Sequence, residues 1–509
     1  MKLIMNVLIV NGHPRKDSLS HGLVNAYIEG AVNAGITIKK LELADLSFNP
    51  NVNHFSPNQQ LSEPHIQQAQ QLILWANHVV FVYPTWWGTI PALLKGFIDR
   101  VFTAGFAFED IEGGTGYAPL LRGRSAQIIT TMDTPWLVYQ LIYRSPGHNA
   151  MRRATLQFCG FSMARTLSFG PVKNSTLTQR NRWINTAENE GLALKKGALT
   201  PSNRFSIKTG NWLKAIRLQF YPMTCAAYGT GAFAAENLGY GYNRSVFWIG
   251  YLWLFLLEVA TVLTNDYFDF KSDEQNKFFS PFTGGSRVLV DKLLSFREVK
   301  NGIWTALILS FTVLGILLSI IPGNISPVLL ACVVLFVLAI GYTVPPLRLS
   351  YRGLGEFTVG LTHSFAVVVC GYIFQGGRID DAFPWLLSVP LFFAVLPSII
   401  LSGIPDYDAD KAASKKTLAV RFGKKGAALL AIFFTILAAI TAVSFELFNL
   451  VPGAYGNMIY AVVPHAVFLI SFIYHYIKNP SPSSRIDSLM VASLIYLIWF
   501  GLIPLIQLS

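Results

Sequence analysis

The spacing of apolar and polar positions divides this chain into two halves of different kinds. In the first half, from residue 5 to about 196, short β-rich runs alternate with amphipathic stretches. The runs predict strands at residues 6–11, 36–41, 78–83, 125–131 and 165–169. The stretches predict helices that include residues 23–32, 65–76 and 90–102. Five strands with helical crossovers indicate an α/β fold with a doubly wound parallel sheet, in which ligands bind at the carboxyl ends of the strands.

Long apolar runs replace this alternation after about residue 218. Each run has about 17 to 22 residues, which is near the length that a helix needs to cross the hydrocarbon of a bilayer. The runs lie near residues 218–238, 246–264, 304–322, 327–344, 357–375, 384–404, 427–448, 456–476 and 488–508. The pattern predicts an all-α, multi-pass membrane bundle of about nine transmembrane helices. Between the halves, residues 194–203 are polar and rich in helix breakers, as is typical of a linker.

Composition and charge support a membrane protein. Only 13% of the residues are charged and 52% are hydrophobic, whereas soluble proteins carry about 25% charged residues. The connectors on one side of the predicted bundle carry sixteen Lys and Arg residues, and those on the other side carry only Arg244 and Arg378. Because positive charge collects in cytoplasmic connectors, we expect the first half to be cytoplasmic and Ser509 to lie outside the cell (inner) membrane. This distribution accounts for the net charge of +12 without a nucleic acid partner.

An acidic segment follows the apolar run at residues 246–264, on the predicted cytoplasmic side. Helical spacing places Asp266, Asp269 and Asp273 on one face of a helix. Three carboxylates on one face repel each other unless something cationic lies between them. Taken alone, the segment is equally compatible with a solvated helix end that carries ordinary acids.

A second acidic segment strengthens the functional interpretation. Asp406 and Asp410 follow the apolar run at residues 384–404 and are four residues apart, so they also share a face. Mg²⁺ prefers hard oxygen ligands and binds through a few carboxylates together with phosphate oxygens. Two acidic segments at the ends of two spans therefore predict a site for a Mg²⁺-chelated diphosphate.

The sequence at these two places resembles a known family. The motif N-D-x-x-D-x-x-x-D at residues 265–273, followed by D-x-x-x-D at residues 406–410, resembles the UbiA superfamily of intramembrane aromatic prenyltransferases. The segments 343–356 and 415–421 look most like the 1,4-dihydroxy-2-naphthoate branch of that superfamily, and the likeness covers about residues 205–509. The chain departs from this branch at Ser414, because the branch usually has Gly before the basic pair.

The UbiA resemblance implies transfer of a prenyl group from an allylic polyprenyl diphosphate to an aromatic ring. The candidate Mg²⁺ ligands are Asn265, Asp266, Asp269, Asp273, Asp406 and Asp410. The candidate catalytic residues are Asp266, Asp269, Asp406 and Asp410, with Lys271, Arg287, Lys415 and Lys416 as cationic partners of the diphosphate. Tyr342 and Tyr351 are candidates to stabilise the allylic cation or to orient the acceptor, although aromatic residues near a membrane interface are usually anchors.

Two loops of the first half follow predicted strands and carry candidate binding residues. Residues 11–20 form a tight loop that enters a helix, and its hydroxyl and N–H groups suit an anion. A simple N-cap by Ser18 or Ser20 explains this loop equally well. The Trp pair within residues 84–88 suits a flat aromatic ring, although Trp pairs are more often core residues. No G-x-G-x-x-G motif follows the first strand, which disfavours a Rossmann domain that binds NAD.

These segments resemble the flavodoxin-like NAD(P)H:quinone oxidoreductases. The likeness covers about residues 5–175 and is most specific in Pro84-Thr-Trp-Trp-Gly88 and the following Ile90-Pro-Ala-Leu-Leu-Lys-Gly-Phe-Ile-Asp-Arg-Val101. It implies a bound FAD or FMN and NADH or NADPH as reductant. The flavin phosphate is expected near His13, Arg15, Ser18 and Ser20. The isoalloxazine ring is expected near Pro84, Thr85, Trp86, Trp87, Gly88, Thr130 and Thr131.

The chain departs from the quinone reductases after Thr131. Residues 132–135, Met-Asp-Thr-Pro, stand where those enzymes often carry a Gly-Gly turn that packs against the flavin. In the loop that follows, Tyr139, Tyr143 and His148 are candidates to assist hydride transfer, although a tyrosine in such a loop is usually a surface residue.

Together the two resemblances imply a bifunctional membrane enzyme of quinone biosynthesis, of the kind that makes menaquinone. We expect a flavodoxin-like domain at residues 1–193, a linker at 194–210 and a UbiA-like domain at 211–509. The reductase would keep the aromatic acceptor or the product reduced, and the resemblance admits a homodimer through the flavodoxin-like domain. Two alternatives stay open: a prenyltransferase with a non-catalytic regulatory flavodoxin-like module, and a transporter with a ligand-sensing soluble domain, because intramembrane acids often mark ion paths.

Overall fold

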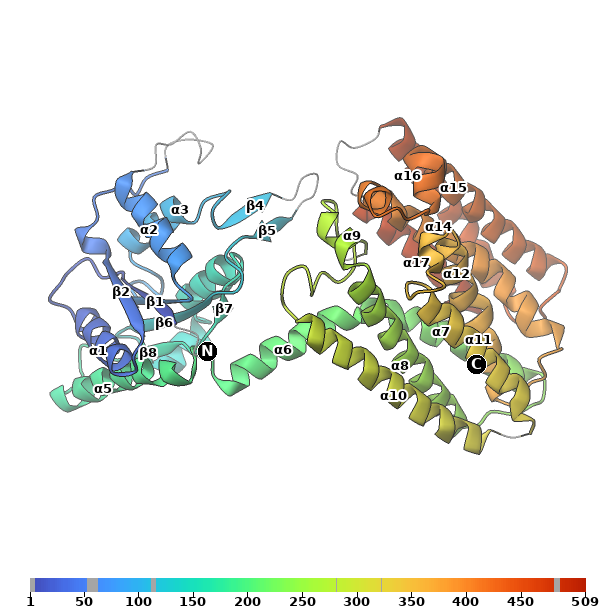
Figure 1. Cartoon of the computed structure of the whole chain (residues 1–509), viewed down its shortest axis with the longest axis horizontal. Coiled ribbons are helices and arrows are strands. Elements are labelled where there is room, and N and C mark those ends of the chain that lie inside the picture. Colours follow the sequence, from blue (N-terminus) through green and yellow to red (C-terminus); the bar gives the residue numbers. More distant parts are fainter. Residues whose placement is uncertain (1–4, 53–62, 111–115, 281, 322, 480–485) are drawn as a thin grey trace. The chain divides into compact units, whose positions relative to one another are not determined.

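The chain forms two compact units, one ending at Thr209 and the other beginning at Gly210. The computed structural model describes residues 5–52, 63–110, 116–280, 282–321, 323–479 and 486–509 (Figure 1). The stretch expected to be a linker is partly helical, because it contains the turn Leu194–Lys196 and the start of helix α6, Pro201–Ile216.

The first unit is built on a parallel sheet, as predicted. Its strands occur in the order β2-β1-β3-β6, and the short strands β7 and β8 both pair with β6. The strands are β1 Asn6–Asn11, β2 Thr37–Glu42, β3 His78–Pro84, β6 Ser125–Thr131, β7 Ser162–Met163 and β8 Leu167–Phe169. The predicted strand at 165–169 thus begins two residues later than expected. A small antiparallel pair, β4 Phe108–Asp110 and β5 Tyr117–Pro119, was not predicted.

Helices cover both faces of this sheet and close two hydrophobic cores. Alternate residues of β1 point to opposite faces: Val7 and Ile9 join one core, and Leu8 and Val10 join the other. The first core includes residues of α1 and α5, and the second includes residues of α2 and α3. The helices are α1 Leu19–Asn33, α2 Pro64–Trp75, α3 Ala92–Val101 and α5 Leu177–Ala193. Because both faces are covered, β1 and β3 are almost continuous apolar runs.

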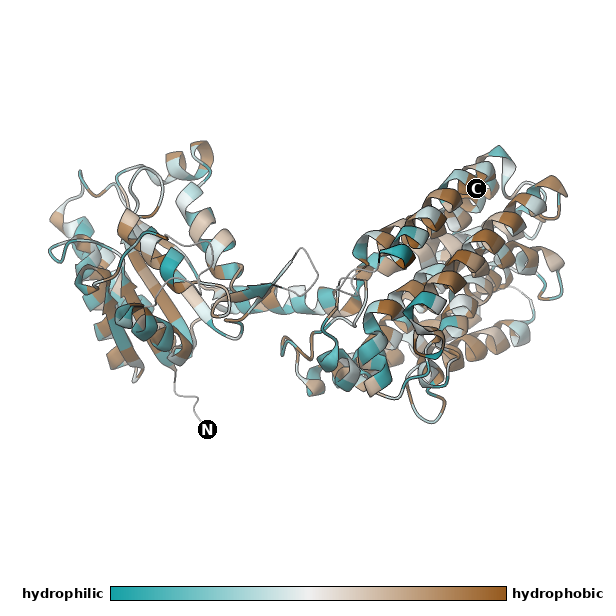
Figure 2. Ribbon diagram, turned by 90° about the horizontal axis from the view of Figure 1, so that it is seen from above, coloured by the Kyte–Doolittle hydropathy of each residue, from teal (hydrophilic) through white to brown (hydrophobic). Residues whose placement is uncertain are grey.

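The second unit is a bundle of long apolar helices, in which hydrophobic residues dominate the ribbons (Figure 2). Its helices are α7 Tyr221–Asn237, α8 Arg244–Phe268, α9 Phe270–Gln275, α10 Phe296–Ile320, α11 Ile325–Gly341, α12 Gly355–Leu361, α13 Val367–Phe374, α14 Ala382–Ala412, α15 Leu418–Leu447, α16 Val462–Lys478 and α17 Asp487–Leu508. Within the described residues, seven helices are long and apolar enough to cross a membrane, and α12 and α13 count as one of them. Helices α7 and α11 have 17 residues each and fall below that length. The predicted count of nine is therefore not confirmed.

Helices α7 and α13 touch through their backbones. A Cβ atom on Gly231 of α7 would lie 1.9 Å from the carbonyl oxygen of Val368, and one on Gly371 of α13 would lie 2.1 Å from the carbonyl oxygen of Tyr228. Small residues at such crossings permit the close approach that drives helix association in lipid. Only glycine fits at these two positions.

The last helix ends beside the end of α7, shortly before α8 begins. The amide of Asn237 at the end of α7 donates to the carbonyl oxygen of Leu508 at 2.6 Å, and α8 begins a few residues after Asn237. The last residues of α17 therefore lie at the opposite end of α8 from Asp266. This agrees with the expectation that Ser509 and the acidic segments lie on different sides of the membrane, although their orientation stays a prediction.

Folding of the first unit should depend on pH through a buried histidine at the start of β3. His78 is fully buried, its Nδ1 lies 2.8 Å from Ser125 Oγ, and burial lowers the pKa of His78 to about 4. An unfolded histidine titrates near 6.5. The neutral folded form therefore contributes stability that is fully present above about pH 6.5 and is lost as the pH falls toward 4.

We expect His78→Asn to flatten this dependence. Between pH 7 and pH 5 the fall in the unfolding free energy of the first unit should be smaller than in the wild type by on the order of 2 kcal/mol. Pulse proteolysis in urea, followed with a tag near the N-terminus of the full chain, measures this quantity. His65, which is only partly buried, provides the control, and His65→Asn should keep the wild-type slope. Equal slopes in all three proteins would contradict the prediction.

Candidate active sites

The first acidic segment lies where α8 ends and α9 begins. Asp266 belongs to the last turn of α8, Asp269 follows that helix, and Asp273 belongs to α9. The N–H of Asp269 donates to the carbonyl oxygen of Asn265 at 2.8 Å, and its own carbonyl oxygen accepts from Ser272 and Asp273. The two helices thus join in a tight corner. Asp266 and Asp269 are buried, with 3% and 4% of their surfaces exposed.

Lysine 415 joins the two acidic segments. Lys415 Nζ lies 3.0 Å from Asp269 Oδ2 and 3.3 Å from Asp410 Oδ1, and all three side chains are buried. Two neutral side chains add to the connection: Ser272 Oγ donates to Asp410 Oδ1 at 3.2 Å, and Asn276 Nδ2 donates to Asp406 Oδ1 at 2.7 Å. Carboxylates more than 130 positions apart in the chain therefore meet in one place.

The pKa values of Lys415 and Asp273 both depend on the charges of the neighbouring acidic side chains. Burial lowers the pKa of Lys415, but the carboxylates of Asp269 and Asp410 outweigh burial and raise that pKa well above its ordinary value. Burial raises the pKa of Asp273, and the nearby Asp266 and Asp269 raise it further. The lysine is therefore held charged, while the surplus of carboxylates makes the group a strong site for further positive charge.

Two tyrosines lie at the edge of the acidic group, in the connector after α11. Tyr351 donates a hydrogen bond to Asp269 Oδ1 at 2.8 Å, and Lys415 Nζ lies 5.3 Å from the centre of its ring. Burial and the charge of Asp269 raise the pKa of Tyr351 to about 12. Tyr342 lies in the field of Asp269, Asp410 and Lys415, and burial raises its pKa. Of the two tyrosines, Tyr351 makes the direct contact with a carboxylate.

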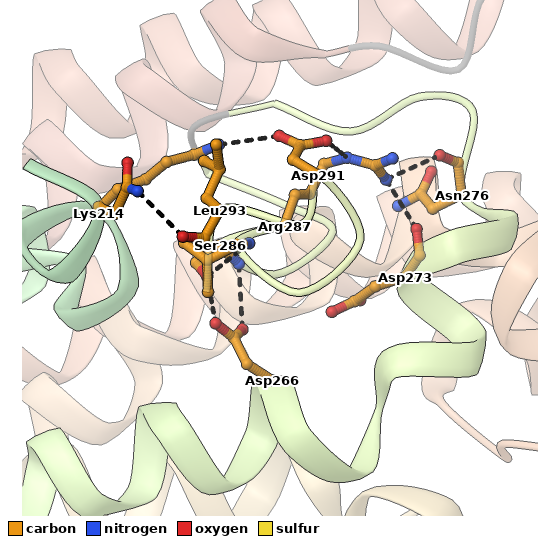
Figure 3. A network of polar contacts seen from close by, with 10 residues as sticks. Lys214, Asp266, Asp273, Asn276, Ser286, Arg287, Asp291 and Leu293 are labelled. Carbon is orange, nitrogen blue, oxygen red and sulfur yellow. Dashed lines mark hydrogen bonds and ion pairs between the residues drawn. The ribbon is translucent and has the colours of Figure 1, made fainter. Parts of the chain in front are cut away.

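A glycine-rich loop covers Asp266 (Figure 3). Ser286 donates to the Asp266 carboxylate from its backbone N–H at 3.1 Å and also from its hydroxyl. A Cβ atom on Gly285 would lie 2.1 Å from Asp273 Oδ2 and 3.2 Å from Asp266 Oδ1, so glycine is required there. Its φ of 69° also lies in the left-handed region that favours glycine. The loop thereby brings two carboxylates against its backbone.

Arg287 holds this loop to α9. Its guanidinium donates to the carbonyl oxygen of Asp273 at 2.7 Å, lies 3.9 Å from the ring centre of Phe279 and is 3.8 Å from Asp291 (Figure 3). Asp291 also accepts from Lys214 of α6 at 3.1 Å. The structure therefore places Arg287 beside the acidic group, with its donors directed to backbone carbonyls.

The remaining candidates differ in position. The side chains of Lys271 and Lys416 are exposed, and neither contacts the acidic residues in the described part of the chain. Asn265 Oδ1 is buried and has no hydrogen-bond partner among the described residues. Within those residues, no group of three or more His, Cys, Asp or Glu side chains is arranged to hold a metal ion by itself.

In the first unit, the loop after β1 lies against the loop after β3. Gly12 N–H donates to the carbonyl oxygen of Val82 at 2.8 Å, and the rings of His13 and Trp86 meet edge to face at 5.7 Å. Ser18 caps α1 by accepting from the N–H of His21, as the N-cap interpretation of this loop predicted. Burial and the charge of Arg15 lower the pKa of His13. The hydroxyls of Ser20 and Thr85 are buried and have no partner among the described residues.

The loop that follows β6 is tied to both segments expected to hold the flavin ring. Tyr139 is fully buried, donates to the carbonyl oxygen of Gly88 at 3.1 Å and accepts from the N–H of His148 at 3.3 Å. His148 Nε2 lies 3.1 Å from Thr130 Oγ1, and burial lowers the pKa of His148 to about 4. The N–H of Thr85 donates to the carbonyl oxygen of Thr131 at 2.7 Å. This network fixes the backbone around Gly88.

Other side chains of these loops face outward. Trp87 is fully exposed, Tyr143 is 54% exposed and Trp86 is 45% exposed. Trp87 and Gly88 both have positive φ angles, 51° and 74°, so the chain turns sharply after β3. Of the three candidates in the loop after β6, Tyr139 and His148 are therefore held at the Gly88 turn and Tyr143 is not.

Comparisons with known proteins agree with the division of the chain into two units. Residues 222–500, more than half of the chain, match the family model described as the UbiA prenyltransferase family. The chain belongs to the UbiA prenyltransferase family. Residues 5–189 match the flavodoxin-like fold model. The match to the naphthoate branch is not tested by these findings and stays a prediction.

Known relatives of the first unit are NAD(P)H oxidoreductases. An uncharacterized NAD(P)H oxidoreductase of Haemophilus influenzae is 33% identical over 174 residues, which cover 33% of this chain and 85% of the relative. Human ribosyldihydronicotinamide dehydrogenase [quinone] is 29% identical over 195 residues, which cover 32% of this chain and 81% of the relative.

A larger part of the chain is similar to a solved structure of digeranylgeranylglyceryl phosphate synthase. That structure is 18% identical, with a TM-score of 0.41, and the match covers 59% of this chain and 98% of that one. This UbiA family member thus carries a flavodoxin-like NAD(P)H quinone oxidoreductase domain at its N-terminal end.

Some site residues were missed by the sequence reasoning. Ser272, Asn276 and Ser286 bind three of the acidic side chains, but only the fold brings them there. Their residue types carry no signal of their own. The Gly-Gly pair at 284–285 is a turn signal that could have pointed to the loop over Asp266.

Ser414 has a structural explanation in this UbiA family member. It follows the end of α14 with a φ of 59°, the left-handed conformation that glycine usually supplies after a helix. The N–H of Ser414 donates to the carbonyl oxygen of Lys411, and that of Lys415 donates to the carbonyl oxygen of Asp410 at 2.9 Å. This pair of bonds is a Schellman motif, and it directs Lys415 back toward the acidic group.

We expect Ser414→Gly to stabilise the bundle. A non-glycine residue in this region costs about 1 to 2 kcal/mol, and glycine loses part of that gain through the entropy of its unfolded chain. The net gain should be up to about 1 kcal/mol, visible as a higher melting temperature of the detergent-solubilised protein. Ser414→Val should lower the melting temperature, because a β-branched residue tolerates this conformation least. A lower melting temperature for the glycine variant would contradict the assignment.

Proposed function

We propose that this protein transfers a prenyl group from an allylic polyprenyl diphosphate to an aromatic acceptor in its membrane domain. Its N-terminal domain uses NAD(P)H and a flavin to keep the acceptor or the product as the hydroquinone. The observation that carries the proposal is the contact of Lys415 with both Asp269 and Asp410. This contact brings together the two acidic segments that a metal-bound diphosphate requires.

The residues present fit Mg²⁺. Asp266 and Asp273 both approach Gly285, the Asn265 amide oxygen is buried without a partner, and Asp406 and Asp410 lie on the neighbouring helix. All of these are hard oxygen donors. Mg²⁺ usually takes one or two carboxylates together with substrate phosphates, so a complete protein cage of three or more ligands is not expected. When bound, the ion neutralises the charge that develops on the departing diphosphate.

Side chains of the protein itself would also assist the departure of the diphosphate and protect the allylic cation. Lys415 is fixed between the carboxylates and carries a positive charge at the place where the diphosphate oxygens would lie. The diphosphate leaves with the electron pair of its C–O bond, and positive charge placed there lowers the barrier to that step. Tyr351, held by Asp269, lies at the edge of the group, and the Arg348 guanidinium lies 4.1 Å from the centre of its ring, which adds a further positive charge there. The surrounding apolar helices exclude water, which would otherwise capture the cation.

The first unit fits a flavin. The N-terminus of α1 offers N–H groups to a phosphate, and the unpartnered hydroxyls of Ser20 and Thr85 lie in the two loops that the flavin would contact. A turn held by Tyr139 offers the backbone of Gly88 to the polar edge of a ring. When bound, the flavin accepts hydride from NAD(P)H and passes two electrons to a quinone. FAD and FMN both agree with these residues.

The two activities are chemically compatible. A quinone ring is too electron-poor to attack a cation, whereas a hydroquinone or phenol ring is electron-rich. A reductase in the same chain as the transferase would supply the reactive form of the acceptor. We therefore assign the protein to the biosynthesis of a prenylated quinone, at the inner membrane.

Asp406→Asn and Asp269→Asn should each lower Mg²⁺-dependent prenyl transfer at least about 100-fold, because each removes a carboxylate that would hold the Mg²⁺ of the diphosphate. Transfer of radiolabel from farnesyl diphosphate to menadiol in nanodiscs measures this. Asp408 is the matched control: it lies in the same segment but is exposed and pairs with Lys424 at 3.2 Å. Asp408→Asn should stay within about twofold of the wild type. Full activity in the Asp406 and Asp269 variants would refute the assignment of the site.

Tyr139→Phe should weaken flavin binding by the first unit about 5- to 30-fold, because the Gly88 carbonyl and the His148 N–H lose a buried partner. Fluorescence titration of the purified full chain with FAD and FMN measures the affinity. Bleaching of the bound flavin by NADH or NADPH then tests the reductase activity. Tyr143→Phe, at an exposed position, should bind like the wild type. A wild-type protein whose flavin is not bleached would favour the non-catalytic regulatory module.

A further inference from the structure

One ionisable side chain inside a membrane-spanning helix belongs to neither site described above. Glu258 lies in α8, eight residues before Asp266, and therefore about 12 Å along the helix from it. It is partly buried. Charged groups at this depth are costly, and they usually line a cavity or bind a partner.

Polar groups from two other elements lie near Glu258. It lies beside Thr224 of α7 and in the electrostatic field of His363. Tyr221, one turn before Thr224, also lies within its field. Tyr221 and Thr224 are each only 4% exposed, and their hydroxyl oxygens are buried with no well-formed hydrogen bond among the described residues. The Thr224 hydroxyl therefore lies against the Glu258 carboxylate, and the Tyr221 hydroxyl is available to bind something else.

The backbone at His363 is irregular. Residues Thr362–Ala366 form a π-helical turn between α12 and α13. Such turns inside α-helices are frequently found at functional sites. Nδ1 of His363 lies 3.1 Å from the carbonyl oxygen of Val359, which fixes the ring and directs its other nitrogen away from that carbonyl.

This polar group lies on the same face of α8 as part of the acidic site. Asn265 is seven residues after Glu258, which is two turns of the helix, and Asp269, at which α8 ends, is eleven residues after it, which is three turns. The side chains therefore form one line, with the unpartnered amide oxygen of Asn265 between its ends.

We propose that Glu258, His363, Thr224 and Tyr221 form the subsite for the hydroxyl group of the aromatic acceptor. The proposal rests on the proposed prenyl transfer and adds to it the place and the polarity of the acceptor site. The ligand class is a phenol or hydroquinone whose hydroxyl points into the membrane domain. The Glu258 carboxylate accepts the hydrogen bond from that hydroxyl, and Thr224 and Tyr221 donate to its oxygen.

The geometry also gives Glu258 a place in the reaction. As the ring carbon attacks the allylic carbon, the C–O bond to diphosphate breaks, a C–C bond forms, and the acceptor hydroxyl gives its proton to Glu258. The product of this step is a cyclohexadienone. Loss of the proton from the newly substituted ring carbon restores aromaticity, and Glu258 returns its proton to the oxygen. The net products are the prenylated phenol, diphosphate and one proton, and no electrons are exchanged with an outside reagent.

The test separates acceptor binding from donor binding in the full chain in nanodiscs. The donors are radiolabelled farnesyl diphosphate for turnover and its thiolodiphosphate analogue for binding, and the acceptors are menadiol, 1,4-dihydroxy-2-naphthoate and 4-hydroxybenzoate. In Glu258→Gln we expect kcat to fall at least about 100-fold and the acceptor KM to rise about 10-fold. The Mg²⁺-dependent affinity for the thiolodiphosphate should stay within about twofold, because Glu258 does not touch the diphosphate.

Matched variants keep the test decisive. Glu236→Gln changes an exposed glutamate of α7 and should behave like the wild type. Thr224→Val and Tyr221→Phe each remove one hydroxyl, and should raise the acceptor KM about 3- to 10-fold with little change in kcat. If Glu258→Gln does not fold, the acceptor kinetics of Thr224→Val and Tyr221→Phe test the subsite instead.

Each outcome has one meaning. A wild type that prenylates none of the three acceptors refutes the proposed function itself. If the wild type is active, the subsite is refuted when the Glu258, Thr224 and Tyr221 variants keep wild-type acceptor kinetics. It is also refuted when Glu258→Gln weakens thiolodiphosphate binding as much as turnover, since the residue would then belong to the donor site.

Discussion

The contact of Lys415 with Asp269 and Asp410 is the interaction on which the membrane domain depends. Several buried carboxylates from two helices would repel each other strongly at this short range and low polarity. One lysine, placed between them by the turn after α14, turns that repulsion into a link between α8 and α14. The lysine does not neutralise the whole group, so the site keeps an excess of negative charge for a metal-bound anion.

In both halves of the chain, the candidate site contains a turn whose residues have positive φ angles. In the first unit the turn at Trp87 and Gly88 is held by Tyr139, and in the second unit Gly285 lets two carboxylates approach a loop. These turns place backbone and side-chain groups more exactly than a flexible loop could. The chemistry of both halves needs this order, because a flavin ring and a diphosphate must each be held in one orientation.

The sequence predicted what local periodicity determines. The strands β1 and β3 were found because they are almost continuous apolar runs, and Asp266, Asp269 and Asp410 were found because helical spacing gathers acids on one face. The sequence did not show which of the adjacent residues Lys415 and Lys416 would reach the carboxylates. That choice depends on the turn after α14, which directs one side chain inward and the next one outward. Ser286 and Asn276 were missed for a related reason, since tertiary contacts alone bring them to the carboxylates. Glu258 was overlooked because a single glutamate hardly alters the hydropathy of a long apolar run.

The glycine crossing of α7 and α13 limits how lipid can reach the interior of the domain. At Gly231 and Gly371 the two backbones are in direct contact, so no acyl or isoprenoid chain can pass between these helices there. The two helices form a seam that cannot part without breaking that contact. A long isoprenoid tail must therefore enter the bundle sideways through a different pair of helices, and its portal to the bilayer lies away from this seam.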